Sequence, residues 1–297
     1  MKSIIIFGGS GYVGKNLIRT FAKKGYKIIV PYQRQTNEAN LRLFGSVGQI
    51  VPFHFRSLKN QKLLSILNDV DICINLKTSW DTNKRNLKKS ILDFNRELVS
   101  SIKSSSIKKF IFFSGLGVQN KLTFRNDIIF KTEELILKEL PNSLIIRPSV
   151  ILGNGDQFLS NLRPIFKIFF FVPLFGDGNN KFQPVLIDDI VKFVTKAIEM
   201  PYLKKNTFEI AGPEILTYKE FYNQIANTMN KKRIFIPVPM FLMQFIVSIG
   251  EKFPFFPINS EQLSLFKIDN ILKNNESGLK YLNISPKRVI SAIKKSL

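Results

Sequence analysis

Cysteine and histidine are almost absent from this chain of 297 residues, which has one of each. The single Cys73 excludes a disulfide framework within the chain, and one cysteine with one histidine leaves no cluster that could hold zinc or an iron–sulfur centre. No metal site is therefore predicted, and a reducing compartment is favoured. Cys73 lies in the apolar run Ile72–Ile74, which indicates an inert core position.

The sequence also has no apolar run long enough to cross a bilayer. The longest uncharged stretch, residues 234–250, contains two prolines and falls short of the roughly 20 apolar residues that a spanning helix needs. The first apolar run begins directly after Met1-Lys2-Ser3 and ends in a glycine turn, so we expect a strand there and no presequence. A cytoplasmic location is the expectation that follows.

Two segments, residues 165–175 and 239–258, are unusually rich in aromatic residues. Core packing is the first interpretation of both. A greasy substrate pocket, a face covered by a partner, and a membrane interface are the alternatives.

Acidic residues are scarce, with 22 Asp and Glu against 44 Lys and Arg, which gives a net charge of +22. Lysine pairs such as Lys88-Lys89 and Lys294-Lys295 are scattered and form no single block, so solvated faces are the first interpretation. An anionic membrane surface, to which the chain would attach peripherally, is the alternative. No RNA or DNA motif accompanies the charge, which argues against a nucleic-acid partner.

Short apolar runs alternate with helix-period segments through the first 150 residues. They predict strands at 3–7, 27–30, 50–53, 71–76, 109–114 and 143–147, and helices near 12–24, 58–68, 83–104 and 126–140. Strands this apolar are covered on both faces. The pattern predicts an α/β fold with a Rossmann-like, doubly wound parallel sheet.

Beyond Pro148 the alternation loosens into loops, short strands near 184–187 and 207–211, and a few helices. One helix is expected from a capping box at Thr217 to Glu220, and the last from Ser285. We therefore predict a dinucleotide-binding domain over residues 1–150. A smaller, mostly helical lobe for substrate or partner is predicted over 151–297, with the two interleaved around 180–215.

A glycine-rich segment, Gly8-Gly9-Ser10-Gly11-Tyr12-Val13-Gly14, directly follows the first predicted strand and opens a helix. Gly8 would allow a tight turn, Gly11 would let a pyrophosphate approach the backbone, and Gly14 would let the helix close on the strand. The helix N-terminus would add amide donors and a positive dipole. A dinucleotide site is predicted, and a packing turn without a ligand is the alternative.

The end of the second strand bears on which dinucleotide binds. An acidic residue there would bind a ribose 2′-hydroxyl, whereas an arginine would accept a 2′-phosphate. The segment offers Arg34 and no carboxylate before Glu38. NADP(H) is therefore preferred, NAD(H) is the alternative, and Arg34 could also be one more surface cation.

Several segments resemble the extended short-chain dehydrogenase/reductase (NAD-dependent epimerase/dehydratase) superfamily over essentially the whole chain. They are GGSGYVG from Gly8, IRPSVILGNGDQF from Ile146, FQPVLIDDI from Phe182 and FEIAGPEILT from Phe208. VPYQR from Val30 and LRLFGSVGQI from Leu41 are similar to a narrower branch, which contains the nucleotide-binding accessory subunit of respiratory complex I and its bacterial relatives. This resemblance implies a Rossmann fold with bound NADPH, a degenerate catalytic centre, and attachment to a respiratory complex at the membrane.

The superfamily's chemistry uses a tyrosine to move a proton, a lysine four residues later, and a serine at the preceding strand end. The resemblance places Ser114 and Lys131 at two of these positions and leaves Asp127 where the tyrosine should stand. The chain has no tyrosine between Tyr32 and Tyr202, and none of its seven tyrosines has a lysine four residues on. A surface ion pair is the alternative interpretation of Asp127 and Lys131.

The resemblance also implies a set of cofactor contacts. They are Gly8, Ser10, Gly11, Tyr12, Val13, Gly14, Arg34, His54, Leu76, Ser114, Lys131 and Pro148. His54 stands where relatives often carry an aspartate that touches the adenine, so a packed or adenine-lining histidine is expected and a general base is not. Arg147 and Asp189 match superfamily positions, and their architectural interpretation is a strand-end residue and a helix cap.

Two functions follow from these patterns, and they leave open whether the chain is an enzyme. The first is an accessory or assembly protein that binds NADP(H) with a degenerate reductase centre. The second is an active NADP-dependent reductase, epimerase or dehydratase on a lipid-like, quinone-precursor or sugar-nucleotide substrate. A basic nucleic-acid-binding relative of these reductases is supported by charge alone.

Overall fold

A seven-stranded sheet is the main element of the computed structural model, which describes residues 2–33, 36–253, 256, 258–274 and 276–296. Its strands follow the order β11-β6-β5-β4-β1-β2-β3, and every pairing from β3 through β6 is parallel. The strands are β1 Ser3–Phe7, β2 Lys27–Tyr32, β3 Ile50–His54, β4 Ile72–Asn75, β5 Lys109–Phe113, β6 Leu144–Pro148 and β11 Thr207–Ile210.

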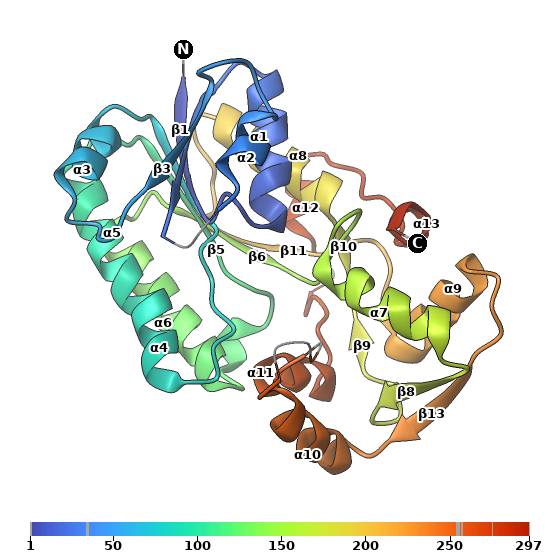
Figure 1. Ribbon diagram of the computed structural model, residues 1–297. Coiled ribbons are helices and arrows are strands. Elements are labelled where there is room, and N and C mark those ends of the chain that lie inside the picture. The colour runs from blue at the N-terminus through green and yellow to red at the C-terminus, as the bar shows by residue number, and fades with distance from the viewer. Residues whose placement is uncertain (1, 34–35, 254–255, 257, 275, 297) are drawn as a thin grey trace. The chain divides into compact units, whose positions relative to one another are not determined.

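Helices cover both faces of this sheet (Figure 1). On one face lies α1 (Tyr12–Lys23), which buries Leu17, Ile18 and Phe21. On the other lie α3 (Gln61–Asn68), α5 (Phe94–Lys103) and α6 (Phe124–Glu139), whose buried residues form one cluster with Ile5, Phe7 and other strand residues. The Rossmann-like, doubly wound α/β fold predicted from the sequence is confirmed.

The shorter elements around the sheet refine the sequence prediction. The helix predicted over 83–104 is α4 (Lys84–Lys88), a π-helical turn (Lys89–Asp93) and α5. The other elements here are α2 Glu38–Arg42, the 3₁₀ turn Val118–Asn120 and α8 Ile187–Glu199. Most predicted strands and helices lie within three residues of the observed bounds.

The chain groups into two compact units. Unit one comprises Met1–Ser79, Lys84–Arg147 and Val191–Phe208, and unit two comprises Trp80–Asn83, Pro148–Ile190 and Glu209–Leu297. The domain boundary at residue 150 stays a prediction.

Unit two combines three short strand pairs with small helices. The pairs are β7 Ile151–Leu152 with β10 Val185–Leu186, β8 Phe171–Phe175 with β13 Ile234–Val238, and β9 Lys181–Phe182 with β12 Leu216–Thr217. The helices are α7 Gln157–Ile168, α9 Tyr218–Thr228, α10 Met240–Gly250, α11 Ser260–Leu263, the 3₁₀ turn Ser264–Lys267, α12 Gly278–Tyr281 and α13 Ile290–Ser296. Their core contains stacked rings of Phe182 and Tyr218, 4.5 Å apart. The capping box predicted at Thr217 and Glu220 is confirmed.

The prediction that the last helix begins at Ser285 is wrong, because α13 begins at Ile290. The backbone amides that would have entered a helix are bound elsewhere. Lys287 donates its N–H to the Asp189 carboxylate at 2.9 Å, and Val289 donates to the Glu214 carboxylate at 2.6 Å. Acceptors distant in sequence therefore replace the first turn of the predicted helix.

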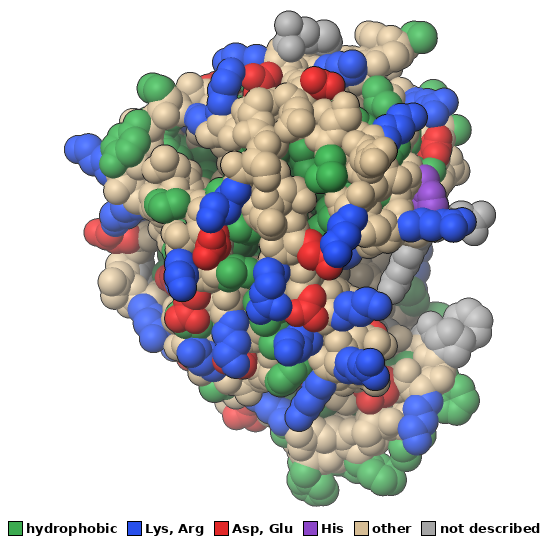
Figure 2. All heavy atoms as spheres, turned by 90° about the vertical axis from the view of Figure 1, so that its left-hand side faces the viewer, with side chains coloured by type: hydrophobic (Ala, Val, Ile, Leu, Met, Phe, Trp, Pro, Cys, Tyr) green, Lys and Arg blue, Asp and Glu red, His purple; other side chains and the backbone are tan. Residues whose placement is uncertain are grey.

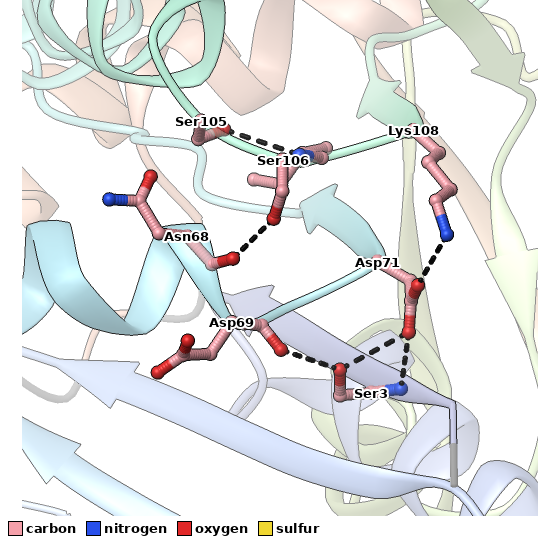
Figure 3. A network of polar contacts seen from close by, with 8 residues as sticks. Ser3, Asn68, Asp69, Asp71, Ser105, Ser106 and Lys108 are labelled. Atoms are coloured by element: carbon pink, nitrogen blue, oxygen red, sulfur yellow. Dashed lines mark hydrogen bonds and ion pairs between the residues drawn. The ribbon is translucent and has the colours of Figure 1, made fainter.

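A polar network fastens the amino ends of β1, β4 and β5 (Figure 3). Asp71 accepts the Ser3 backbone N–H at 3.1 Å and the Lys108 ammonium at 3.1 Å. The Ser3 hydroxyl donates to the Asp69 carbonyl at 3.1 Å. The backbone N–H of Ser3, followed by Lys108, lowers the pKa of the Asp71 carboxyl from its ordinary value. The charged carboxylate is thus favoured by folding.

Asp71→Asn is expected to lower the free energy of unfolding by about 1 kcal/mol at neutral pH, as for a partly exposed ion pair with a hydrogen bond. Because folding lowers this pKa, the contribution is present above the ordinary carboxyl pKa of about 4 and is lost as the pH falls through the folded value. Urea denaturation at several pH values checks this. If the difference in the free energy of unfolding between wild type and Asp71→Asn became larger in acid, the result would contradict this expectation.

Candidate dinucleotide site

The loop after β1 requires glycine at its first position. Gly8 has φ +75°, and a Cβ atom there would lie 2.9 Å from the Leu76 carbonyl carbon. The Gly11 N–H donates to the Gly8 carbonyl at 3.1 Å and closes the turn. A left-handed backbone pressed against a neighbouring strand end is a conformation that glycine alone adopts readily. The turn predicted for Gly8 is present.

The rest of the loop brings α1 close to β1 and leaves its outer side open. A Cβ at Gly14 would lie 2.4 Å from the Gly9 carbonyl oxygen, so the first turn of α1 rests directly on the loop. Among the described residues beyond its chain neighbours, a Cβ at Gly11 would meet only the Gly8 carbonyl oxygen, at 3.3 Å. Gly11 is the N-cap, no side chain caps this helix, and its first turn holds no acidic residue. Amides at such a helix start suit a diphosphate.

This loop lies where the strand order reverses. β1 has β2 on one side and β4 on the other, and ligands of open α/β sheets bind at the carboxyl ends of strands at such a point. Leu76, a predicted cofactor contact, donates its N–H to the Phe7 carbonyl at 2.9 Å. The structure therefore brings Gly8 and Leu76 together.

Two buried asparagines that sequence reasoning missed hold the end of β4. The Asn75 amide donates to the Asn95 carbonyl oxygen at 2.7 Å, and Asn95 donates to the Ile91 carbonyl at 2.8 Å. Asn75 also accepts the Lys77 N–H at 2.9 Å. The signal in the sequence was a polar residue ending an otherwise apolar strand. Asn95 follows the π-helical turn, a feature that often marks functional positions.

At the ends of β2 and β3, Tyr32 and His54 are register partners with ring centroids 5.4 Å apart. The Tyr32 hydroxyl donates to Glu38, whose carboxylate also binds Arg42 at 2.9 Å. This bond to Glu38 raises the pKa of Tyr32. His54 is exposed. Arg34, on which the NADP(H) preference rests, lies outside the described residues, so that preference stays a prediction.

The three positions of the predicted catalytic centre lie on β5 and α6. Ser114 follows β5, and its buried hydroxyl has no hydrogen-bond partner in the part of the chain that the structure describes. On α6 the Lys131 ammonium donates to the Asp127 carboxylate at 2.7 Å. The Lys131 side chain is 52% exposed and that of Asp127 is 24% exposed. The i, i+4 spacing thus gives the ion pair that the sequence offered as its alternative.

Arg147 and Asp189 have structural contacts. Arg147, on β6, binds the buried carboxylate of Glu133 on α6 through two nitrogens, at 2.9 and 2.5 Å. Asp189 was expected as a helix cap, but it lies inside the first turn of α8 and accepts the Lys287 N–H. The helix-cap interpretation is wrong, because a capping residue precedes the first helical residue, here Ile187, whereas Asp189 follows it. Pro148 is buried at the end of β6.

The sequence model of the NAD dependent epimerase/dehydratase family matches residues 4–132, which include β1, the glycine loop, Ser114 and Lys131. The predicted resemblance to this family is confirmed.

Mitochondrial proteins named NADH dehydrogenase (ubiquinone) 1 alpha subcomplex subunit 9 are similar to this chain over most of its length. The Arabidopsis thaliana protein is 24% identical, with 96% of this chain and 74% of the relative covered. The Dictyostelium discoideum protein is 27% identical, with 81% and 68% covered. The narrower branch suggested by residues 30–34 and 41–50 is therefore represented among the relatives.

Among solved structures, UDP-glucuronic acid 4-epimerase from Bacillus cereus, in complex with UDP-glucuronic acid and NAD, has a TM-score of 0.73. It is 16% identical, and the match covers 99% of this chain and 97% of the epimerase. A likeness at this identity shows the shared fold alone.

Proposed function

We propose that this chain is a dinucleotide-binding accessory or assembly protein of a respiratory complex, in which the nucleotide is a structural ligand. The similarity to subunit 9 of mitochondrial NADH dehydrogenases supports the association with such a complex. The glycine loop supports the nucleotide. A ligand bound by the folded chain alone stabilises the fold by mass action, by about 2.7 kcal/mol at 100 times its dissociation constant.

The observation that carries the proposal is the contact between Asp127 and Lys131. A reductase of this family needs a phenol that gives up or takes a proton beside a lysine. Here the lysine ammonium donates instead to a carboxylate at 2.7 Å, and an ion-paired carboxylate only accepts hydrogen bonds. The predicted positions therefore lack the phenol that the family's proton relay uses.

The residues of the loop fit a dinucleotide without this relay. The amides at the start of α1, around Ser10 to Val13, would hold the diphosphate, and Tyr32 and His54 would lie beside the adenosine end. A bound nicotinamide would supply hydride chemistry. The chain's own residues then bind and orient the nucleotide.

The expected location, which is cytoplasmic with peripheral attachment to the inner membrane, stays a prediction.

One observation favours the second candidate, an NADP-dependent reductase, epimerase or dehydratase. The buried Ser114 hydroxyl, without a hydrogen-bond partner among the described residues, is the kind of group that a substrate oxygen could satisfy. The substrate would be lipid-like, a quinone precursor or a sugar nucleotide. In this case Ser114, Lys131 or a water would replace the tyrosine.

Steady-state NADPH consumption with quinone and carbonyl substrates distinguishes the accessory protein from the active enzyme. We expect wild-type turnover below about 1 per second, the low end of ordinary enzyme rates. Asp127→Tyr is expected to raise the rate by about 100-fold, because it frees Lys131 from its carboxylate partner and supplies the missing phenol.

Lys131→Met in the Asp127→Tyr background is the control and should remove the gain. Wild-type turnover above about 1 per second would contradict the accessory role. An inactive Asp127→Tyr variant that still binds NADPH would contradict the claim that only the proton relay is missing.

A further inference from the structure

The helix α10 presents apolar side chains to solvent. It contains no charged residue, and Met243, Val247 and Gly250 form the stripe that it buries. Phe241 is 74% exposed and Phe245 is 63% exposed. A surface helix of a soluble protein carries polar residues in such positions. The exposed large side chains of this helix are Phe241, Leu242, Phe245, Ile246 and Ile249.

The strand pair before α10 extends this surface. β13 runs into α10 through Pro239 and pairs with β8 so that Ile234 lies opposite Phe171 and Ile236 opposite Pro173. These residues are exposed, whereas Val172 and Leu174 point into the core. The exposed residues 168–171, Ile234, Ile236 and those of α10 together form what we call the apolar face of unit two.

The core packing expected for residues 165–175 and 239–258 is therefore wrong for the outer side chains of both segments. Figure 2 shows hydrophobic side chains gathered at the lower edge of the view, at the height where α10 lies in Figure 1. Exposed apolar residues that occur singly need no explanation, but many of them on elements that follow one another directly mark a surface that binds something.

Cations flank the apolar face, and acidic residues are rare beside it. Lys167 precedes residues 168–171, Lys231 and Lys232 precede β13, and all three are exposed. The sequence has no Asp or Glu from 157 to 176 or from 221 to 250. Glu251, the first acidic residue after α10, accepts the N–H and the hydroxyl of Ser260, each at 2.8 Å.

Three lysines also line a hollow next to this face. An open hollow of about 730 Å³ is bordered by Lys167, Asn227, Thr228, Met229, Lys231 and Lys294. Lys167 is covalently adjacent to the exposed apolar segment 168–171. The Lys231 ammonium donates to the Lys167 carbonyl at 3.1 Å, which places it at the same edge. A phosphate group in this hollow would meet ammonium and amide donors.

We propose that the apolar face of unit two binds the surface of an anionic phospholipid bilayer. The aromatic and aliphatic side chains would enter the headgroup–acyl boundary, while the lysines of the hollow contact lipid phosphates. In the part of the chain that is described, no helix has the length and apolar character to cross a bilayer, so the contact is interfacial. The charge around the face favours lipid over an apolar protein partner, because every flanking lysine complements an anionic surface.

Flotation with phospholipid vesicles tests the inference and needs no nucleotide, so its outcome is separate from the accessory role. We expect the chain to bind vesicles of phosphatidylcholine with phosphatidylglycerol, and to bind pure phosphatidylcholine vesicles much more weakly. The Phe241→Ser, Phe245→Ser pair should weaken binding to the anionic vesicles by about tenfold or more. The triple variant Lys167→Gln, Lys231→Gln, Lys294→Gln should weaken binding to the anionic vesicles by a similar factor and leave binding to pure phosphatidylcholine vesicles unchanged.

Matched controls change the same chemistry in unit one. Leu43→Ser with Val47→Ser removes two exposed apolar side chains. Lys59→Gln, Lys88→Gln, Lys89→Gln removes the same charge from exposed positions. Both controls should stay within about twofold of wild type, because none of their residues belongs to the apolar face or lines the hollow.

Several outcomes would overturn the proposal. The first is that the chain does not bind the anionic vesicles. The second is that the phenylalanine pair leaves vesicle binding unchanged. The third is that the control variants lose as much vesicle binding as the test variants. A dimer in solution that the phenylalanine pair disperses, without vesicle binding, would assign the face to a second copy of the chain. Thermal unfolding of each variant shows that it is folded.

Discussion

Gly14→Ala is expected to abolish dinucleotide binding and to lower the free energy of unfolding by about 3 kcal/mol. The added Cβ would lie 2.4 Å from the Gly9 carbonyl oxygen and 2.5 Å from the Gly9 Cα. Both neighbours are backbone atoms, so no side chain can rotate away. The start of α1 must then move away from the loop. This movement takes the helix amides away from the position proposed for the diphosphate. Fluorescence titration with NADPH and urea denaturation measure the two effects.

Gly25→Ala is the matched control, because Gly25 follows the other end of α1. Apart from Gly25 itself and its two chain neighbours, no described residue has an atom within 4 Å of the added Cβ, so only the positive φ of +79° opposes the substitution. The expected cost is about 1 kcal/mol, with NADPH binding unchanged. If Gly14→Ala bound NADPH as well as wild type does, the loop would not be the nucleotide site.

Removal of the Glu133 carboxylate should give the largest loss of stability away from the loop. Glu133 is 2% exposed and binds Arg147 through two nitrogens, at 2.9 and 2.5 Å. Glu133→Leu leaves the guanidinium largely buried without its carboxylate, which costs about 3–5 kcal/mol in comparable cases. Urea denaturation measures this. The double change Glu133→Leu, Arg147→Leu should recover much of the loss, because no charge then stays buried.

A second ion pair on the same helix is the control. Asp127→Asn breaks the Lys131 contact at the helix surface and should change stability by about 0.5 kcal/mol or less. A Glu133→Leu variant as stable as Asp127→Asn would show that β6 and α6 do not depend on the buried pair.

The part of the site that the sequence predicted is built from residues close together in the chain. Five consecutive buried residues of β1 run into the glycine loop and then α1. Strand propensity, turn geometry and helix start all act within this short segment, so each can be predicted from its neighbours. The contact between Asp127 and Lys131 was predictable for the same reason, since helical spacing fixes it.

What the sequence could not predict depends on contacts between distant segments. Asn75 meets Asn95 across 20 residues, and the sequence pattern contains no sign of the π-helical turn before Asn95. Asp189 and Lys287 are 98 residues apart, and their bond replaces a helix start that local rules favoured. Apolar composition likewise cannot tell a buried aromatic from an exposed one, which is why α10 was expected in the core.

Under the proposed function, the chain holds a dinucleotide at the loop after β1 and does not oxidise or reduce it catalytically. The most direct measurement is mass spectrometry of the purified protein under native conditions, followed by an assay of the released nucleotide. We predict one nucleotide for each chain, NADP(H) rather than NAD(H), with its redox state unchanged after incubation with quinone and carbonyl substrates. A chain that carries no nucleotide and whose melting temperature does not rise with added NADPH or NADH would contradict the claim.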